Sequence, residues 1–177
     1  MRRGHMVSRY EIYRSRHLAG CVKRYSTWPM IHEQTVGQHC WRVACIFIEI
    51  FGLPRAEVLL YCLHHDSGEL YSGDIPFRIK REVEGLKDLM NKAEALGLKQ
   101  LELTLPELTK EELIQVKISD LLEMHERGEY EYNLGNAYAE PIIHDTMYDA
   151  QKLAKESCMS EHVNRWLMER GSTKYVR

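Results

Sequence analysis

The stretch from Leu59 to Glu69 constrains the chain most, because an apolar helical pattern runs directly into ionisable side chains. Four of its residues are spaced i, i+3, i+4 and i+7 and so share one helix face: Leu59, Cys62, Leu63 and Asp66. His65 is adjacent to that face. Burying an ionised carboxylate costs several kcal/mol unless a cation meets it. A metal ion is the natural partner, because imidazole and carboxylate are ligands for zinc, manganese, cobalt and iron.

Two further polar residues lie on predicted helix faces that are otherwise apolar. Residues 35–51 are predicted as a helix capped by its first residue, and His39 lies near the start of its apolar face. A single histidine in such a place is more often a core residue that bonds a backbone carbonyl than a ligand. Thr109 opens another helix through a capping box, and Asp120 stands in its apolar stripe. A half-buried aspartate is usually hydrogen-bonded or ion-paired, and Lys117 is a candidate partner.

The remaining periodicity predicts an all-α fold of roughly six or seven helices. Further helices are expected over residues 7–20, 54–65, 82–99, 137–155 and 161–170. The inner stripe of the 82–99 helix is expected to include Val83 and Leu89. Residues 67–76, which contain glycine and proline, and the polar residues 128–135 are expected to be loops. No stretch predicts a convincing strand.

Composition limits the possible partners. The 177 residues suit a single domain, taken as residues 1–177, and the 44% hydrophobic fraction indicates a folded globule. A formal net charge of −2 gives no electrostatic case for binding a nucleic acid polymer or an anionic membrane. No apolar run approaches the ~20 residues of a membrane span, and the basic N-terminus lacks the apolar core of a secretion signal. The five cysteines lack the spacing of a zinc knuckle and fit a reducing compartment, so we expect a cytoplasmic protein.

Two loops carry residue types that suit a nucleotide site. Residues 23–33 are rich in aromatic and basic side chains, and such a segment either walls a pocket for a base and a phosphate or serves as a packed connector. Residues 67–76 keep Glu69 and Asp74 close to the His–Asp pair. Three cations follow within residues 77–81. Because cations are poorly placed at a helix N-terminus, they slightly favour an anionic ligand nearby.

Two imidazoles and two carboxylates from three predicted helices can hold one divalent metal and leave positions open for water and substrate. These residues, His39, His65, Asp66 and Asp120, form an H…HD…D pattern, and the chain closely resembles the HD-domain phosphohydrolase superfamily. Within it, the chain is similar to the bacterial 5′-deoxynucleotidases of the YfbR type and to related phage deoxynucleotide hydrolases, including the dATP triphosphohydrolases. The resemblance is strongest over residues 24–122. It is carried by Arg24-Tyr25, Gln34-Thr35-Val36-Gly37-Gln38-His39, Val43-Ala44, His65-Asp66-Ser67-Gly68-Glu69, Gly73-Asp74-Ile75-Pro76 and Lys117-Ile118-Ser119-Asp120.

The resemblance implies a role for each matching residue. The ligands of one divalent transition metal (Zn, Mn, Co or Fe) would be His39, His65, Asp66 and Asp120. A triphosphate substrate would bring a second divalent ion such as Mg. The residues that activate or position water, or protonate the leaving oxygen, would be Glu69 and Asp74. The substrate-binding residues would be Arg24, Tyr25, Gln34, Lys80 and Lys117.

Two departures from the family pattern bear on the substrate. The nucleotidases commonly carry Trp at the position of Tyr25, beside the sugar, and Glu at the position of Gln34. Gln34 is closer to the phage pattern, and loss of that acid would ease entry of a more anionic substrate, because a triphosphate repels a nearby carboxylate. His64 stands where the family does not bind metal, so we interpret it as structural.

The expected function is metal-dependent hydrolysis of 2′-deoxyribonucleotides at the 5′ α-phosphate, giving a deoxynucleoside plus phosphate or triphosphate. One alternative is a guanosine tetraphosphate hydrolase, but that family carries an acid where Leu70 follows Glu69. Another is a non-catalytic, metal-containing nucleotide sensor, which the retained Glu69 and Asp74 disfavour. A helical interaction module without metal is a third. We expect self-association into a dimer or larger assembly, as in the similar families. The base, the metal, and the choice between monophosphate and triphosphate stay open.

Overall fold

The computed structural model describes residues 8–75, 79 and 82–171, and these residues form an all-α fold, as predicted. The elements are α1 (Arg9–Gly20), α2 (Val36–Phe51), α3 (Ala56–His64), α4 (Glu69–Ser72), α6 (Leu86–Gln100), α7 (Lys110–Asn133), the short 3-10 helix η1 (Ala137–Ala139), α8 (Glu140–Glu156) and α9 (Ser160–Glu169). Over the described residues, β pairing is limited to one isolated bridge between Lys23 and Thr35. None of the described helices is long and apolar enough to cross a membrane.

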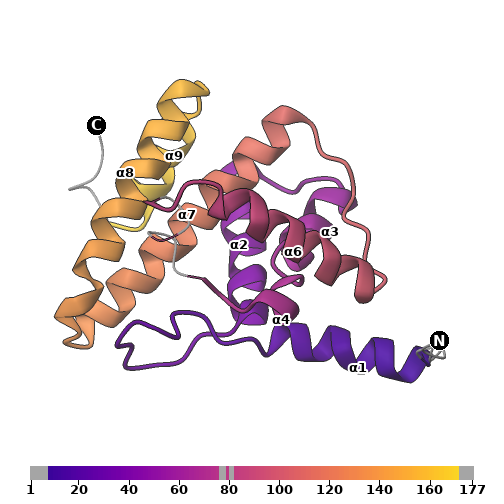
Figure 1. The fold of residues 1–177 in the computed structure, drawn as a ribbon. Coiled ribbons are helices and arrows are strands. Elements are labelled where there is room, and N and C mark those ends of the chain that lie inside the picture. Colours follow the sequence, from indigo (N-terminus) through magenta and orange to yellow (C-terminus); the bar gives the residue numbers. More distant parts are fainter. Residues whose placement is uncertain (1–7, 76–78, 80–81, 172–177) are drawn as a thin grey trace.

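Helices α2 and α7 form the centre of the molecule, and Figure 1 shows α8 and α9 on one side of them and α3, α4 and α6 on the other. Two apolar clusters flank this centre. The larger lies among α2, α7, α8 and α9 and includes Ile46, Ile118, Leu122, Met147 and Trp166. The smaller lies among α2, α3 and α7 and includes Val43, Phe47, Val58, Cys62 and Val116. Because α2 and α7 pack on both sides, some of their polar side chains, such as His39 and Glu123, are held in the interior.

Capping boxes fix where the two central helices begin. Thr35 accepts a hydrogen bond from the backbone of Gln38 at 3.3 Å, and the Gln38 side chain bonds back to Thr35. Thr109 and Glu112 make the same pair of bonds at the start of α7. Both caps agree with the sequence prediction, and they set the rotational register of the polar residues that follow on each helix.

The prediction of a loop over residues 128–135 is wrong, because α7 continues to Asn133. Gly128 lies inside this helix at its contact with α8, where an added Cβ would come within 2.9 Å of Ile143 Cγ1. Glu131 is fully buried there. The polar residues are thus part of a packed helix, whose burial depends on partners that are distant in the sequence.

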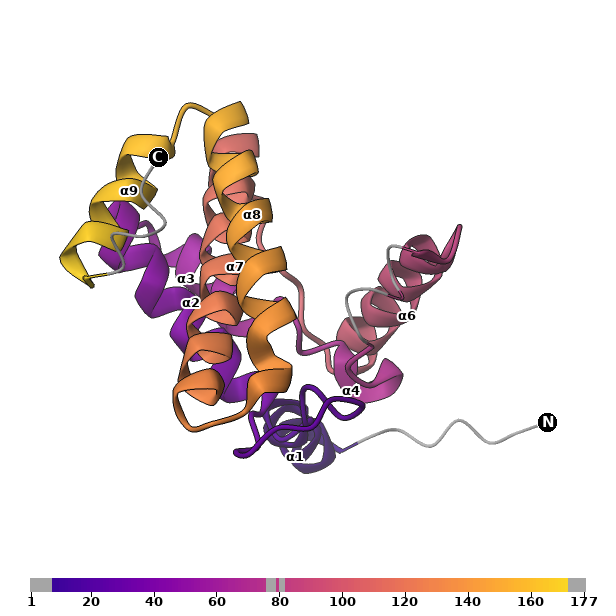
Figure 2. The ribbon, with the colours of Figure 1, turned by 90° about the vertical axis from the view of Figure 1, so that its left-hand side faces the viewer.

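The region around α4 and α6 also differs from the prediction. The short helix α4 forms inside the predicted loop over residues 67–76, and α6 begins at Leu86, after Gly85 with φ of 75°. Val83 and Leu89 are 50% and 63% exposed, so they are not inner residues, and Leu63 of α3 is also exposed. The physical reason is that α6 packs on α4 through a close backbone contact, where an added Cβ on Gly97 would lie 2.5 Å from the carbonyl oxygen of Gly68. Figure 2 shows the α6 ribbon apart from those of α7 and α8, and most residues of α6 are exposed or half-buried.

Candidate active site

The four predicted metal ligands converge at the centre of the fold. His39 comes from the first turns of α2, His65 and Asp66 directly follow α3, and Asp120 comes from α7. His39 Nε2 lies 3.2 Å from an oxygen of Asp120 and 3.4 Å from an oxygen of Asp66. His65 Nε2 lies 3.5 Å from the other oxygen of Asp66. One ligand atom from each of His39, His65 and Asp120 fits within 4.8 Å of the others.

These separations fit a shared divalent ion. In a tetrahedral site with metal–ligand bonds of about 2.0–2.1 Å, neighbouring ligand atoms stand about 3.3 Å apart. The Nε2 atoms of His39 and His65 are both buried and lack a hydrogen bond of normal geometry in the described part of the chain. Buried polar atoms are rarely left in this state. Two such nitrogens beside two carboxylates form a donor set that suits a transition metal.

The electrostatics of the cluster favour a positive charge between these residues. Burial and the nearby Arg24 would lower the pKa of His39, but the carboxylates of Glu123 and Asp120 outweigh them and raise it to about 9. Burial would also lower the pKa of His65, but Asp66 raises it to about 9. Burial would raise the pKa of Asp120, but Lys117 and His39 hold it well below its usual range. A metal ion supplies the same stabilising charge to the two acids and competes with protons for the two imidazoles.

The other ring nitrogen of each histidine is held by the protein. His65 Nδ1 donates to the backbone carbonyl of Cys62 at 2.9 Å. His39 Nδ1 lies 2.6 Å from Oε2 of Glu123 and donates to it. Each bond leaves the Nε2 lone pair directed at the centre of the cluster, which is the usual arrangement of a metal-binding histidine.

Glu123 was missed by the sequence reasoning. It is 2% exposed and lies three residues after Asp120, so both project from the same side of α7. The i, i+3 spacing from Asp120 was the sequence signal that could have identified Glu123. Its oxygens also meet Gln34 Nε2 at 2.5 Å and Arg24 Nη1 at 3.2 Å. Glu123 therefore joins the loop before α2 to the interior of the fold.

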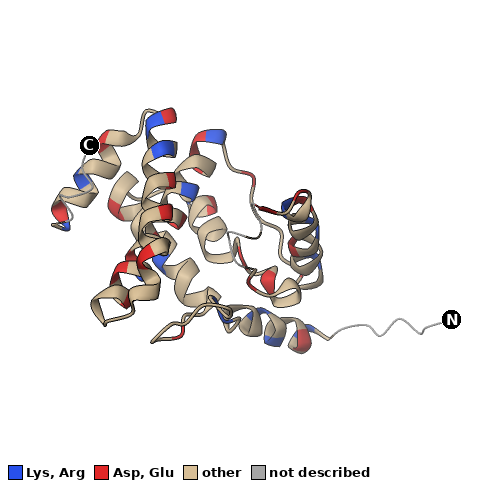
Figure 3. Cartoon of the chain, turned by 60° about the vertical axis from the view of Figure 1, so that its left-hand side comes forward, with Lys and Arg blue, Asp and Glu red and all other residues tan. Residues whose placement is uncertain are grey.

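Two cations border the carboxylates. The side chain of Arg24 is only 8% exposed, and the surrounding acids and Tyr25 raise its pKa against the effect of burial. Lys117 Nζ lies 2.5 Å from an oxygen of Asp120, as the sequence suggested, and Asp120 raises the pKa of Lys117. About half of the Lys117 side chain is exposed, so its amine lies at the mouth of the site. Elsewhere, Figure 3 shows acidic and basic residues interspersed along the helices.

A cavity of about 410 Å³ opens onto this cluster. The predicted site residues that line it are Arg24, Tyr25, Asp66, Glu69, Asp74, Lys117 and Asp120. Trp28, Met124 and Ile142 add an apolar wall, and Asp145 of α8 borders it. The cavity thus combines an ionic end with a wall suited to a planar, apolar group.

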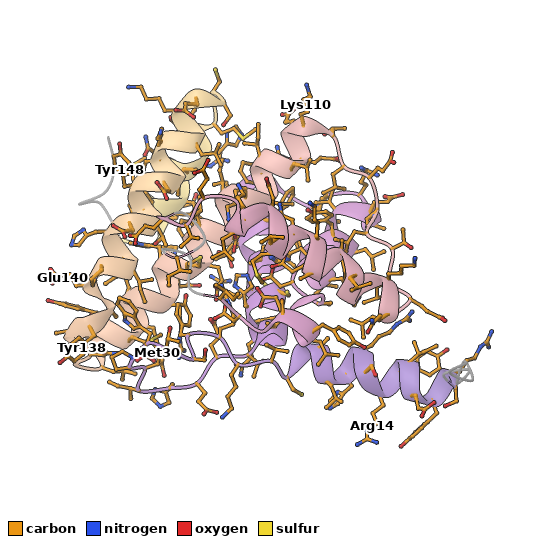
Figure 4. All side chains as sticks on the ribbon, in the orientation of Figure 1. Arg14, Met30, Lys110, Tyr138, Glu140 and Tyr148 are labelled. Atoms are coloured by element: carbon orange, nitrogen blue, oxygen red, sulfur yellow. The ribbon has the colours of Figure 1, made fainter. Side chains whose placement is uncertain are left out.

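Residues 23–33 form part of this wall, so they are more than a connector. Tyr25 has φ of 57°, and its backbone N–H donates to Asp74 at 2.7 Å, which ties the loop to the segment after α4. Trp28 donates to the carbonyl of Tyr138 at 2.9 Å. Figure 4 shows Met30 of this loop close to Tyr138, at the end of the molecule where α7 and α8 meet.

Among the described residues, one predicted substrate residue does not line the cavity. The Gln34 side chain is buried behind Arg24, bonds Glu123, and is not among the lining residues, so the prediction that it faces the substrate does not fit its position. The physical reason is that the buried Gln34 amide donates to the buried Glu123 carboxylate, so each group satisfies the hydrogen-bonding need of the other. Lys80 lies outside the described residues. His64 bonds Ser67 at 3.3 Å, away from the cluster, in line with a structural role.

Comparison with known proteins identifies the family. The model of the family described as "5'-deoxynucleotidase YfbR-like" matches residues 17–133. The chain belongs to the YfbR-like 5′-deoxynucleotidase family. It is therefore an HD-domain phosphohydrolase, as the resemblance implied. No curated protein sequence matches the chain.

A solved relative has the same fold as this YfbR-like protein. It is the cyanophage S-2L HD phosphohydrolase DatZ, bound to dA and one catalytic Zn²⁺ ion. The two chains are 22% identical, the match covers 97% of this chain and 98% of that one, and the TM-score is 0.71. The YfbR-like family match includes all four predicted metal ligands and Glu123 but ends with α7. Helix α8, which contributes Ile142 and Asp145 to the cavity, lies beyond it.

Proposed function

We propose that this YfbR-like protein is a metal-dependent hydrolase of 2′-deoxyribonucleotides that cleaves at the 5′ α-phosphate. The products are a deoxynucleoside and either phosphate or triphosphate. The observation that carries the proposal is the placement of two imidazoles and two carboxylates beside Arg24 and Lys117, at the ionic end of a cavity with an apolar wall. Family membership and the dA bound by DatZ support a deoxynucleoside as the organic part of the substrate.

The residues that would hold the metal are His39, His65, Asp66 and Asp120. A bound divalent ion would polarise a phosphoryl oxygen and lower the pKa of its water ligand toward neutrality. Zinc is the first candidate, because the donor set suits it and DatZ contains it, and manganese, cobalt and iron also fit this donor set. A second ion such as Mg would accompany a triphosphate.

The chain's own residues bind and orient the phosphate. Arg24 lines the cavity and donates a hydrogen bond from Nη1 to Glu123. Its other guanidinium nitrogens are therefore positioned to donate to a non-bridging phosphate oxygen. Lys117 adds a second cation beside Asp120. Both stabilise charge that grows on the phosphoryl group in the transition state. Lys80 stays a proposed third contact.

Two acids are proposed to handle the protons. Glu69 is 4% exposed and lines the cavity at the start of α4. Its burial suits a general acid that protonates the leaving 5′ oxygen. Asp74 accepts a hydrogen bond from the Tyr25 N–H with one oxygen, so it positions the loop of residues 23–33 and presents its remaining oxygen to water.

The apolar wall indicates where the nucleoside lies. Met124 follows Asp120 by one helical turn, so the wall begins about 6 Å along α7 from the metal ligands. A nucleoside whose 5′ phosphate is at the ligands would lay its base against Trp28, Met124 and Ile142. Tyr25, with its ring beside Arg24 at 5.4 Å, would then border the sugar.

The decisive experiment is a product assay on the eight common deoxynucleoside mono- and triphosphates, with zinc, manganese or cobalt added. We expect release of phosphate from monophosphates or of triphosphate from triphosphates, and no release by Asp66→Asn. Metal-loaded protein that binds deoxynucleotides without releasing either product would instead establish a sensor. Guanosine tetraphosphate serves as a ninth substrate, and its preferential cleavage would overturn the proposal. Self-association is part of the proposal and is measured by sedimentation of the same preparation.

A further inference from the structure

We infer that Glu123 is a positioning residue that holds the metal ligand His39 and the phosphate-binding Arg24 with a single buried carboxylate. This inference rests on the proposed function for the role of Arg24. Oε2 of Glu123 accepts from His39 Nδ1 at 2.6 Å and from Arg24 Nη1 at 3.2 Å. Oε1 accepts from Gln34 Nε2 at 2.5 Å. The side chain is 2% exposed, so these three donors take the place of water.

The bond to His39 fixes the tautomer of the imidazole. With the proton on Nδ1, the Nε2 lone pair is directed at Asp66 and Asp120. A carboxylate behind the ring also makes it a stronger ligand than a neutral acceptor would. Loss of the negative charge at Glu123 is therefore expected to weaken metal binding even where the fold is retained.

The bond to Arg24 fixes the guanidinium in the cavity wall. Nη1 faces Glu123 and, more distantly at 3.4 Å, Gln34 Oε1. No bond from Nη2 or Nε to a protein group is present within the described residues, so that edge can meet a phosphate. Because one oxygen of Glu123 accepts from both donors, the metal ligand and the phosphate cation are placed by the same atom.

Gln34 allows the two roles to be separated. Exchange of the two side chains, in the double variant Gln34→Glu/Glu123→Gln, keeps one carboxylate and one amide in the same buried volume. The carboxylate at residue 34 would face Arg24 but not His39. The exchange should therefore restore phosphate binding and leave metal binding weak.

The test measures two affinities in wild type, Glu123→Gln and the exchange variant. Zinc affinity is measured by competition with a chromophoric chelator. Phosphate contact is measured, at saturating zinc, as the affinity of a non-hydrolysable 5′-phosphonate analogue of dAMP divided by that of deoxyadenosine. Glu126→Gln, also on α7 but paired with Arg42 and without a bond to His39, Arg24 or Gln34, is the matched control.

We expect Glu123→Gln to lose about 10- to 100-fold in zinc affinity, the range seen when the partner of a metal-binding histidine is removed. The phosphonate ratio should fall as well. In the exchange variant the ratio should return to the wild-type value while zinc affinity stays low, and Glu126→Gln should match wild type in both. Unchanged zinc affinity in folded Glu123→Gln, or recovery of both quantities in the exchange variant, would overturn the inference. Neither readout needs turnover, so an inactive wild type that binds zinc would reject the proposed hydrolysis and leave this test intact.

Discussion

Oε2 of Glu131 accepts a hydrogen bond from the backbone N–H of Ile31 at 2.6 Å, and Oε1 accepts from the N–H of His32 at 3.0 Å. Glu131 lies near the end of α7 and is fully buried, and Arg127 and Asn136 donate to the same carboxylate at 2.9 and 3.1 Å. The two backbone amides belong to the segment that lines the cavity. One acid thus anchors the far end of the loop of residues 23–33 to a central helix.

Glu131→Gln should destabilise the protein by about 2–4 kcal/mol, because a carboxamide cannot accept from all of these donors and leaves some of them buried without an acceptor. Urea unfolding followed by circular dichroism measures the change. Glu169→Gln, an exposed acid at the end of α9, is the control and should stay close to wild type. An equal stability of the two variants would mean that the loop is not held by Glu131.

The contribution of Glu131 to the free energy of unfolding should decrease as the pH falls. Burial would raise the pKa of this carboxyl, but hydrogen bonds from Ile31, Asn136 and His32 and the charge of Arg127 lower it below 4.5. A group with a depressed folded-state pKa stabilises the fold fully above its unfolded pKa and loses that effect as the pH falls through its folded pKa. The difference in unfolding free energy between wild type and Glu131→Gln should therefore be largest above about pH 5 and shrink in more acidic solution. A difference that grows with acidification would contradict the assignment.

The sequence predicted that His39, Asp66 and Asp120 would come together, and the structure brings them together. The prediction was possible because a buried face that carries such groups poses an energetic problem that few arrangements solve. That these residues bind a metal stays a prediction. Glu123 was missed and Gln34 was misplaced for one shared reason. Both are buried by long-range contacts that connect residues 24 and 34 to α7. Helical periodicity carries no information about such partners. The polar end of α7 was predicted as a loop for the same reason, since two of the donors to Glu131, the backbone N–H groups of Ile31 and His32, come from a distant segment.

Alanine substitution of each of the adjacent histidines, His64 and His65, tests which of them binds the metal. His65→Ala should reduce bound zinc from about one ion per chain to near none, because its Nε2 faces Asp66 in the cluster. His64→Ala removes a neighbouring imidazole of the same type that bonds only Ser67 in the described structure, and it should retain zinc and turnover. Elemental analysis of the dialysed proteins measures bound zinc, and the product assay measures turnover. Zinc loss in His64→Ala, with retention in His65→Ala, would reverse the assignment.

Asp145 should influence which base is preferred. It is half-buried on α8, lines the cavity, and has no hydrogen bond or ion pair within the described residues. Its carboxylate can accept from the exocyclic amino group of adenine, cytosine or guanine, which thymine lacks. Asparagine keeps a neutral oxygen acceptor, so Asp145→Asn removes only the charge-assisted part of this hydrogen bond, about 1 kcal/mol. The variant should therefore reduce the preference for deoxyadenosine over thymidine nucleotides by about fivefold in kcat/KM. Glu140→Gln, an exposed acid on the same helix, is the control. If Asp145→Asn keeps the wild-type ratio between the two substrates, the base does not reach α8, and the apolar wall formed by Trp28 and Met124 must hold it nearer the metal ligands.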